Sequence, residues 1–364
     1  MTLSGRQVGI IGAGVAGLTS AMTLAARGAA VTVCEEALAF EDVGAGIQLS
    51  PNALRVFAAL GCDPAAMMPV TTPRRLSLRD LRGGWQIMGY HQPPGYIQVH
   101  RADLIGWLAE TAAGMGADIR LGQAARPGEW PTTVIASGVH TARPGPGAAF
   151  TGQVAWRALI PCPSDFVRDP GTRVYIGPGR HLVLYPLRNA TLLNIVAVEE
   201  GQDWTEEGWQ HPGDPDALRR AFSDACDPVQ AVLASVTRAR RWALRAHTEV
   251  RMVTDAGAPL VGDAAQAMLP FVAQGAAMAI EDAHVLARAM EIDDLDAYAR
   301  KRAARRSRVA RAAIRNGRIF HEARPWWLPF QRVGMWGLGR VAPGLIQRQY
   351  AWIYDADVTE EPLA

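Results

Sequence analysis

The sequence predicts an α/β protein in which a mostly parallel sheet is interrupted by an inserted antiparallel sheet and followed by a C-terminal helical segment. Strand and helix patterns alternate near both ends of the 364-residue chain, residues 151–246 read as strands joined by turns, and the tail is rich in tryptophan. We expect a discontinuous first domain (1–70, 98–150 and 247–320), a second domain (71–97 and 151–246) and a helical cap (321–364).

The first element is a strand, turn and helix spanning residues 7–28. An apolar strand runs into Gly12-x-Gly14-x-x-Gly17, and apolar residues then recur at helical spacing until Gly28. In such a turn the first glycine permits the tight bend, the second lets backbone approach a pyrophosphate, and the third allows the helix to pack closely on the strand.

A second strand follows at 30–34 and ends beside an acidic residue, Glu35. An acid about 20 residues after the glycines accepts a hydrogen bond from a ribose hydroxyl. The unit is therefore Rossmann-like and predicts a bound dinucleotide, which these residues alone leave open as FAD or NAD.

The next elements are a glycine-containing loop and a helix. Gly44 and Gly46 indicate either an ordinary turn or backbone lying against a flat ligand, and Ser50 caps a helix that ends near Leu60. A hairpin is expected within 71–97, and Arg101 then opens another helix, followed by strands at 118–121 and 132–137.

The second domain is predicted from period-2 patterns at 154–160, 172–176, 181–187 and 192–198, with a helix at 216–233. The last two of these strands are expected to form a hairpin. Alternation in the third of these strands places His181, Val183 and Tyr185 on one face. Arg157 and Arg180 are candidates to bind a carboxylate of a ligand.

The first domain resumes with a strand at 258–261 that runs into Gly262 and Asp263. Asp263 is either a turn residue or an acceptor for sugar and ribitol hydroxyls. After Pro270 and Gly275 comes a helix at 276–290. Four places are expected to meet at one site: the Gly12–Gly17 turn, Arg101, Gly262-Asp263 and the segment from Pro270 to Gly275.

Two C-terminal features have alternative interpretations. The arginine-rich helix at 295–320 predicts solvated faces with local ion pairs, or else binding to an anionic surface. The tryptophan-rich tail predicts a packing cap over the second domain, or else contact with a membrane surface.

Composition narrows the function. A net charge of +2 gives no indication of nucleic-acid binding, and four widely separated cysteines fit neither a metal site nor a disulfide framework. The chain starts directly with a strand, and no apolar run reaches the ~18 residues of a membrane span. We expect a cytoplasmic monomer or homodimer without a metal.

Five stretches resemble, in order and spacing, the single-component FAD-dependent aromatic hydroxylases, and most closely their salicylate-hydroxylase-like branch. They are GIIGAGVAGLTSAMTLAARGAAVTVCEEA, GAGIQLSPNALRVFAALG, HRADLIGWL, GRHLVLYPLR and LVGDAAQAMLPFVAQGAAMAIEDA. The resemblance covers nearly the whole chain, including the tail that ends in AWIYDAD.

The resemblance implies FAD as the cofactor. It places Glu35 on the adenosine ribose, Arg101 near the ribityl-pyrophosphate, Asp263 on the pyrophosphate-ribitol region and Gly44 to Gly46 near the isoalloxazine. The helix that opens near Gly275 then points at the flavin pyrimidine ring, where its dipole stabilises negative charge. NADH or NADPH is implied as a co-substrate without a separate domain.

The implied reaction is hydroxylation of a small aromatic, phenolic substrate with O2. The nicotinamide reduces the flavin, O2 adds at C4a, and the hydroperoxide transfers its distal oxygen to the ring. Apolar residues around Pro270 would exclude water. His181 is a candidate base for phenol deprotonation, or else a structural histidine, and Tyr185 is a candidate for positioning.

One departure from the family pattern is Ser137, which stands where an aspartate is usual. Together with the apolar tail it motivates an alternative, a non-hydroxylating flavoprotein oxidoreductase or epoxidase acting on an apolar substrate. A second alternative, from another class, is a non-catalytic FAD-binding regulator.

Overall fold

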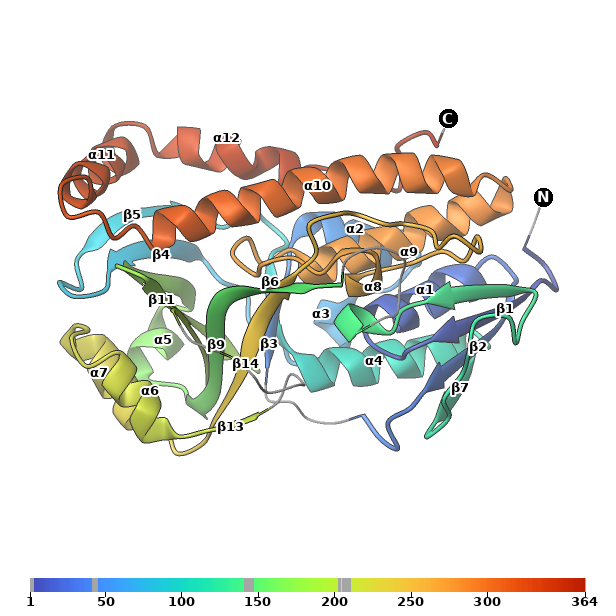
Figure 1. Cartoon of the computed structure of the whole chain (residues 1–364), viewed down its shortest axis with the longest axis horizontal. Coiled ribbons are helices and arrows are strands. Elements are labelled where there is room, and N and C mark those ends of the chain that lie inside the picture. The colour runs from blue at the N-terminus through green and yellow to red at the C-terminus, as the bar shows by residue number, and fades with distance from the viewer. Residues whose placement is uncertain (1–2, 41–44, 141–146, 202–203, 205–210, 364) are drawn as a thin grey trace.

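The computed structural model describes residues 3–40, 45–140, 147–201, 204 and 211–363. Gly44 therefore lies outside the described residues. The elements form two main sheets, bridged by a long helix that runs from one to the other (Figure 1). No helix in these ranges is long and apolar enough to cross a membrane.

Sheet A is the parallel sheet, with strand order β7-β2-β1-β8. Its strands are β1 (Gln7–Ile11), β2 (Ala30–Glu35), β7 (Asp118–Leu121) and β8 (Thr132–Ile135). Its helices and the associated two-stranded ribbon are α1 (Val15–Ala25), α2 (Pro51–Ala59), α3 (Pro64–Met67), α4 (Arg101–Gly114), β3 (Gly46–Leu49) and β6 (Ile97–His100). Helix α1 packs on α4 and on α9 (Gly275–Glu291), so an apolar core holds in place the helix that follows the β1–α1 turn.

Three expectations for this half need correction. Ser50 precedes α2 but makes no capping bond, because its hydroxyl bonds Asn52 and Gln274 instead. Gly46 begins strand β3 rather than lying in a loop. The segment 258–261 forms only isolated bridges, one of them between Ile135 and Leu260, and Pro259 lacks the N–H that a continuous ladder needs.

Sheet C is the larger sheet, with order β13-β14-β9-β12-β11-β10-β4-β5, in which only β10 and β4 pair in parallel. Its strands are β4 (Arg75–Asp80), β5 (Gln86–His91), β9 (Ala149–Pro161), β10 (Gly171–Gly177), β11 (Arg180–Leu187), β12 (Leu192–Glu200), β13 (His211–Gly213) and β14 (Ala239–Ala246). The predicted hairpins β4–β5 and β11–β12 are present, whereas β13 and β14 were not expected from the sequence.

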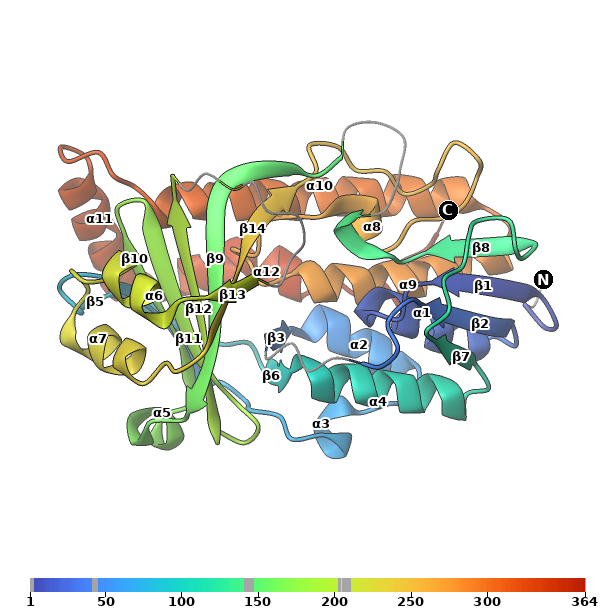
Figure 2. The same cartoon turned by 60° about the horizontal axis from the view of Figure 1, so that its bottom comes forward.

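The two faces of sheet C differ. On the outer face, side chains such as Leu182, Leu184 and Ile195 are fully or almost fully buried, and helices cover them, as Figure 2 shows. These helices are α5 (Ser164–Arg168), α6 (Pro215–Ala221) and α7 (Asp227–Ala234). The last two replace the single helix expected at 216–233. The opposite, inner face carries His181, Val183 and Tyr185, as the alternation predicts.

The bridging helix is α10 (Leu295–Phe320), which packs on α9. The expectation of solvated faces with only local ion pairs is wrong, because Arg302 and Arg306 are buried and pair with Glu281 and Asp282 of α9 at 2.7 Å. A short stretch of sequence cannot reveal this, because the acidic partners belong to the preceding helix, α9, and lie 20 to 24 residues earlier in the chain.

The tail forms α11 (Leu328–Val341) and α12 (Pro343–Tyr354). Helix α11 lies on β5, and Arg332 donates to the Ile176 carbonyl at 3.1 Å, so the helix covers one edge of sheet C. Phe330 and Val333 on the same helix remain exposed. The division of the chain into three segments stays a prediction.

Candidate active site

The glycine turn after β1 has the geometry that its spacing predicts. Gly12 has φ +100°, and a Cβ there would stand 2.7 Å from the Ala136 carbonyl oxygen. A Cβ on Gly17 would stand 1.8 Å from the Gly12 oxygen, so α1 packs directly on the turn. Gly14 is different, because no protein atom lies within 4 Å of its Cβ position. The backbone at Gly14 is thus accessible to a ligand beside the N-terminus of α1.

Glu35 ends β2 next to this turn. One carboxylate oxygen accepts from the Ala13 N–H at 2.8 Å and the other from the Ala37 N–H at 3.1 Å. The carboxylate is therefore held in place at the turn by backbone donors. Its remaining lone pairs suit the hydroxyls of a ribose.

A second turn, at Gly262, faces the first. Gly262 has φ +64°, and a Cβ there would stand 2.7 Å from the Ala16 Cβ on α1. Its N–H donates to Asp282 at 3.1 Å, and its carbonyl accepts from the buried Arg306 at 2.7 Å. Side chains of α9 and α10 thus hold both the N–H and the carbonyl of Gly262, which positions the next residue, Asp263.

Arg101 lies between the two turns. Its backbone N–H donates to the Ala45 carbonyl at 2.8 Å. Burial lowers the pKa of Arg101, while the charges of Asp263 and Glu35 act in the opposite direction. Burial likewise raises the pKa of Asp263, although its side chain reaches solvent, and Arg306 and Arg101 oppose that rise. Arg101 is thus within electrostatic reach of both Glu35 and Asp263.

The N-terminus of α9 is the third part of the site. Pro270 and Gly275 border this end, and the Gly275 Cβ position has no protein atom within 4 Å. Gln274, just before the helix, receives a hydrogen bond from Asn52 at 3.1 Å and donates to Ser50 at 2.9 Å. These buried contacts fix the helix end against α2, so its free N–H groups have a defined direction.

The inner face of sheet C is the fourth part. Tyr185 lies on Gly46, where a Cβ would stand 2.5 Å from the tyrosine ring, and Asn194 accepts from the Gly46 N–H at 3.0 Å. Val183 and Val196 are half-buried, whereas the side chains of the outer face are buried. The inner face is thus an apolar wall that solvent reaches, beside the turn at Gly46.

Arg157 is the cationic group on this wall. Its guanidinium lies 4.4 Å from the centre of the Trp242 ring, and its buried Nε has no hydrogen-bond partner among the described residues. Burial lowers the pKa of Arg157 to about 10, so it is charged at neutral pH. Arg180 differs, because it points away from this face and pairs with Asp224. Of the two arginine candidates, only Arg157 is available to an anionic ligand.

His181 is buried at the other end of the wall. Its ring lies 5.0 Å from that of Phe271, next to Pro270, and its Nδ1 is 2.6 Å from Nε2 of His321. The Nδ1 of His321 is 2.6 Å from a carboxylate oxygen of Glu200. Burial, reinforced by His321, holds the pKa of His181 well below its usual range, so His181 is neutral at neutral pH.

The contacts determine the tautomers of this pair. A carboxylate only accepts, so His321 donates from Nδ1 to Glu200. The neutral ring of His321 then accepts at Nε2, which requires His181 to donate from Nδ1. The Nε2 of His181 is therefore an acceptor, and it has no hydrogen-bond partner in the part of the chain that the structure describes.

Some of these residues could not be found from sequence. His321 and Glu200 lie 140 and 121 residues from their partners, and neither belongs to a motif. Arg306 was hidden in an arginine-rich run. Ser137 lies two residues after the end of β8, and its Cα would be 3.1 Å from a Cβ on Gly12, so it borders the nucleotide turn.

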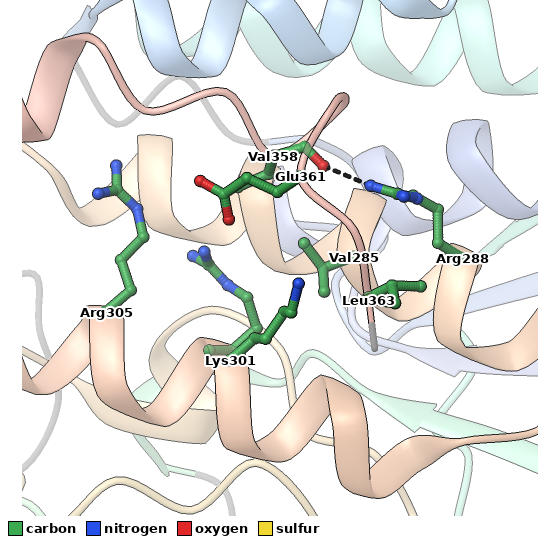
Figure 3. Close-up of a pocket in the computed structure, with 8 residues that line it drawn as sticks. Val285, Arg288, Lys301, Arg305, Val358, Glu361 and Leu363 are labelled. Atoms are coloured by element: carbon green, nitrogen blue, oxygen red, sulfur yellow. Dashed lines mark hydrogen bonds between the residues drawn. The ribbon is translucent and has the colours of Figure 1, made fainter.

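A separate cavity of about 120 Å³ lies between α9, α10 and the C-terminal residues. Figure 3 shows Glu361 above Lys301, with Arg288 bonded to the Val358 carbonyl. Charged side chains dominate its lining, and none of the predicted site residues belongs to it. It is therefore not the place for an aromatic ligand.

Together, the two turns, the helix end and the apolar wall define a dinucleotide-binding protein whose second sheet faces the nucleotide site. Residues 153–313 match the model of a family described as "FAD binding domain". The chain is 31% identical to the 3-amino-4-hydroxybenzoate 2-monooxygenase PtnB3 of Streptomyces platensis, over 86% of this chain and 88% of the relative. It is 28% identical to the 3-hydroxybenzoate 6-hydroxylase of Polaromonas naphthalenivorans, over 86% and 87%.

A salicylate hydroxylase in complex with its substrate has the same fold, with a TM-score of 0.79 and 21% identity over 98% of this chain and 97% of that one. The chain belongs to the FAD-dependent monooxygenases that hydroxylate aromatic compounds. The expected cofactor, FAD, is confirmed by this membership. The structure fits that cofactor. The turns at Gly12 and Gly262 leave no room for a side chain, and the helix ends at Gly14 and Gly275 are open to a ligand.

Proposed function

We propose that this monooxygenase hydroxylates a small phenolic acid, using NADH or NADPH as the reductant. FAD, when bound, supplies the activation of O2 for transfer of one oxygen atom to the ring. Gly12, Gly14, Gly17 and Glu35 would hold its adenosine diphosphate, and the group of residues that would hold the remainder comprises Gly44, Gly46, Arg101, Gly262, Asp263 and Gly275.

Arg157 is the residue that supports a substrate with a carboxylate group. It is a charged guanidinium beside the half-buried Val183 and Val196 on a wall that solvent reaches, and its Nε is without a partner among the described residues. A substrate carboxylate would satisfy that donor and make a charge-assisted hydrogen bond. The relatives named above act on hydroxylated benzoates by their names, which supports the same substrate class.

The other residues of the wall would orient the ring and handle its proton. Tyr185 would contact the substrate from its place on Gly46, and burial raises its pKa to about 12, so it remains a hydrogen-bond donor. His181 would accept the phenol proton at Nε2, which increases the electron density of the ring. Pro270 and the neighbouring Phe271 would exclude water.

The test is substitution of Arg157 by Met, which keeps the length of the side chain and removes the charge. We expect the KM for a hydroxybenzoate to rise roughly tenfold to 100-fold, because a hydrogen bond to a charged group contributes about 1.5–3 kcal/mol. The KM for the matching hydroxybenzamide should change little. NADH and NADPH oxidation, O2 uptake and product formation are measured together.

Arg180→Met is the matched control, since Arg180 lies on β11, two strands from β9 in the same sheet, and faces the outer side. Equal losses for the acid and the amide in Arg157→Met would show that Arg157 supports the fold rather than binding a carboxylate. Product formation on neither compound by the unaltered enzyme would remove the phenolic-acid assignment.

A further inference from the structure

We propose that His321 and Glu200 form a proton relay that carries the phenol proton from His181 to solvent. The proposal rests on the function proposed above, in which His181 is the base. It assigns a role to two residues that no motif marks, and it answers a physical requirement. A buried base can act repeatedly only if its proton leaves the protein.

The three groups form an unbroken line from the interior to the surface. His181 is 2% exposed and His321 is 5% exposed, whereas the Glu200 side chain is 43% exposed. Both links measure 2.6 Å, which is within hydrogen-bond reach. The line therefore ends at a carboxylate that exchanges protons with water.

Each member is held by a different element. His181 pairs with Val198 on β12, so Glu200, two residues further, projects from the same face of the sheet. The backbone of His321, at the end of α10, accepts from the Gly179 N–H at 3.2 Å, and Glu200 donates its own N–H to the Gly179 carbonyl at 2.9 Å. The backbone of Gly179 thus bonds both His321 and Glu200, which keeps the imidazole of His321 beside the carboxylate.

The proton count is balanced along the line. The phenol O–H bond breaks and its proton joins Nε2 of His181; the Nδ1 proton of His181 passes to Nε2 of His321. The Nδ1 proton of His321 passes to Glu200, which releases one proton to water. No electron moves. When the hydroxylated product takes up a proton on its phenolic oxygen, the reverse sequence restores the original tautomers.

The surroundings of the relay keep both of its histidines neutral. Burial lowers the pKa of both histidines, with Glu200 partly opposing the effect at His321, so both rings are neutral and able to accept a proton. Gln153 donates to Glu200 at 2.9 Å. The neighbouring elements carry three further charged groups. Arg332 of α11 lies 3.6 Å from Asp80 of β4, and Glu322 directly follows His321 in the chain.

The relay is tested on the FAD-loaded enzyme with 4-hydroxy-3-nitrobenzoate, whose phenolate is coloured. Stopped-flow absorbance follows formation of the bound phenolate, and a pH indicator in weak buffer follows the proton that reaches solvent. Glu200→Gln keeps the size and the acceptor oxygen of the side chain but cannot take up and release a proton. His321→Gln breaks the middle of the line.

We expect both variants to bind the probe with unchanged affinity and to release the proton about 100-fold more slowly, the lower end of the range for loss of a proton-transfer group. Added imidazole should restore the rate in Glu200→Gln, because the site of Glu200 is open to solvent. Glu199→Gln is the control: Glu199 bonds Trp156 on the outer face at 2.8 Å and should have no effect.

Proton release at the normal rate in both Glu200→Gln and His321→Gln would overturn the relay. A different result concerns the base itself. If His181→Gln forms the bound phenolate as readily as the unaltered enzyme, the role of His181 in the proposed function fails. A slow His181 variant with normal Glu200 and His321 variants would retain the base and reject the relay.

Discussion

Replacing Arg306 by Met tests whether α10 positions the cofactor turn. Arg306 is fully buried and donates to Asp282 at 2.9 Å, to the Gln266 carbonyl at 2.9 Å and to the Gly262 carbonyl at 2.7 Å. Methionine fills much of the same volume but supplies none of these donors. The perturbation is therefore mainly electrostatic.

The magnitude follows from the groups that lose a partner. The carbonyls of Gly262 and Gln266 lose their guanidinium donor, at about 1–3 kcal/mol for each buried group left unsatisfied. Asp282 retains Arg302 at 2.7 Å and the Gly262 N–H at 3.1 Å, so its charge stays partly compensated. We expect a loss of about 3–5 kcal/mol in the free energy of unfolding, as for other broken buried ion pairs.

Urea unfolding of the apoprotein measures that loss as a lower midpoint at an unchanged slope. FAD binding to the folded variant should weaken about tenfold for each 1.4 kcal/mol by which the Gly262 turn is disturbed. Arg311→Met is the control, since Arg311 is exposed on the same helix. The reasoning would be refuted by an Arg306→Met protein that unfolds at the same urea concentration as the Arg311 variant.

Three further predictions concern stability, cofactor binding and pH. Burial lowers the pKa of His284 from 6.5 to about 4. As the pH falls below 6.5, His284 is therefore protonated in the unfolded chain before it is protonated in the folded protein. The free energy of unfolding is unaffected above pH 6.5 and falls by about 3 kcal/mol toward pH 4. His284→Gln should therefore flatten the decline of the urea midpoint in that window. Gly12→Ala places a Cβ 2.7 Å from the Ala136 oxygen and should destabilise the apoprotein, whereas Gly14→Ala, with open space around it, should weaken FAD binding without lowering apoprotein stability; equal unfolding midpoints for the two variants would contradict this. Since the pKa of Tyr185 is about 12, Tyr185→Phe should alter KM but leave the shape of the kcat/KM profile between about pH 6 and 10 unchanged.

Local patterns predicted the parts of the site that depend on short stretches of chain. The positive φ of Gly12, the open space at Gly14 and the shared face of His181, Val183 and Tyr185 follow from spacing and alternation alone. Each is determined by backbone geometry within a few residues, and the structure has all of them where they were expected.

Contacts between distant segments could not be predicted in that way. The link from His181 to His321 depends on how α10 ends against sheet C, and the burial of Arg306 depends on which face of α10 meets α9. Charge composition suggested an exposed helix, because buried arginines are rare unless they are paired. The pairing itself exists only in three dimensions.

Sheet C also has a consequence for changes of substrate. Its outer face is committed to a tightly packed core, while Val183, Val196 and Leu159 project from the inner face and remain half-buried. Because alternate residues of a strand serve opposite faces, exchanging these three positions leaves the side chains of the outer-face core in place, while Val183 and Val196 also pack on smaller clusters of the inner face. A small library at these positions would explore new substrates while the nucleotide turns stay constant. Evolution of specificity on this scaffold is thereby separated from maintenance of its outer-face core.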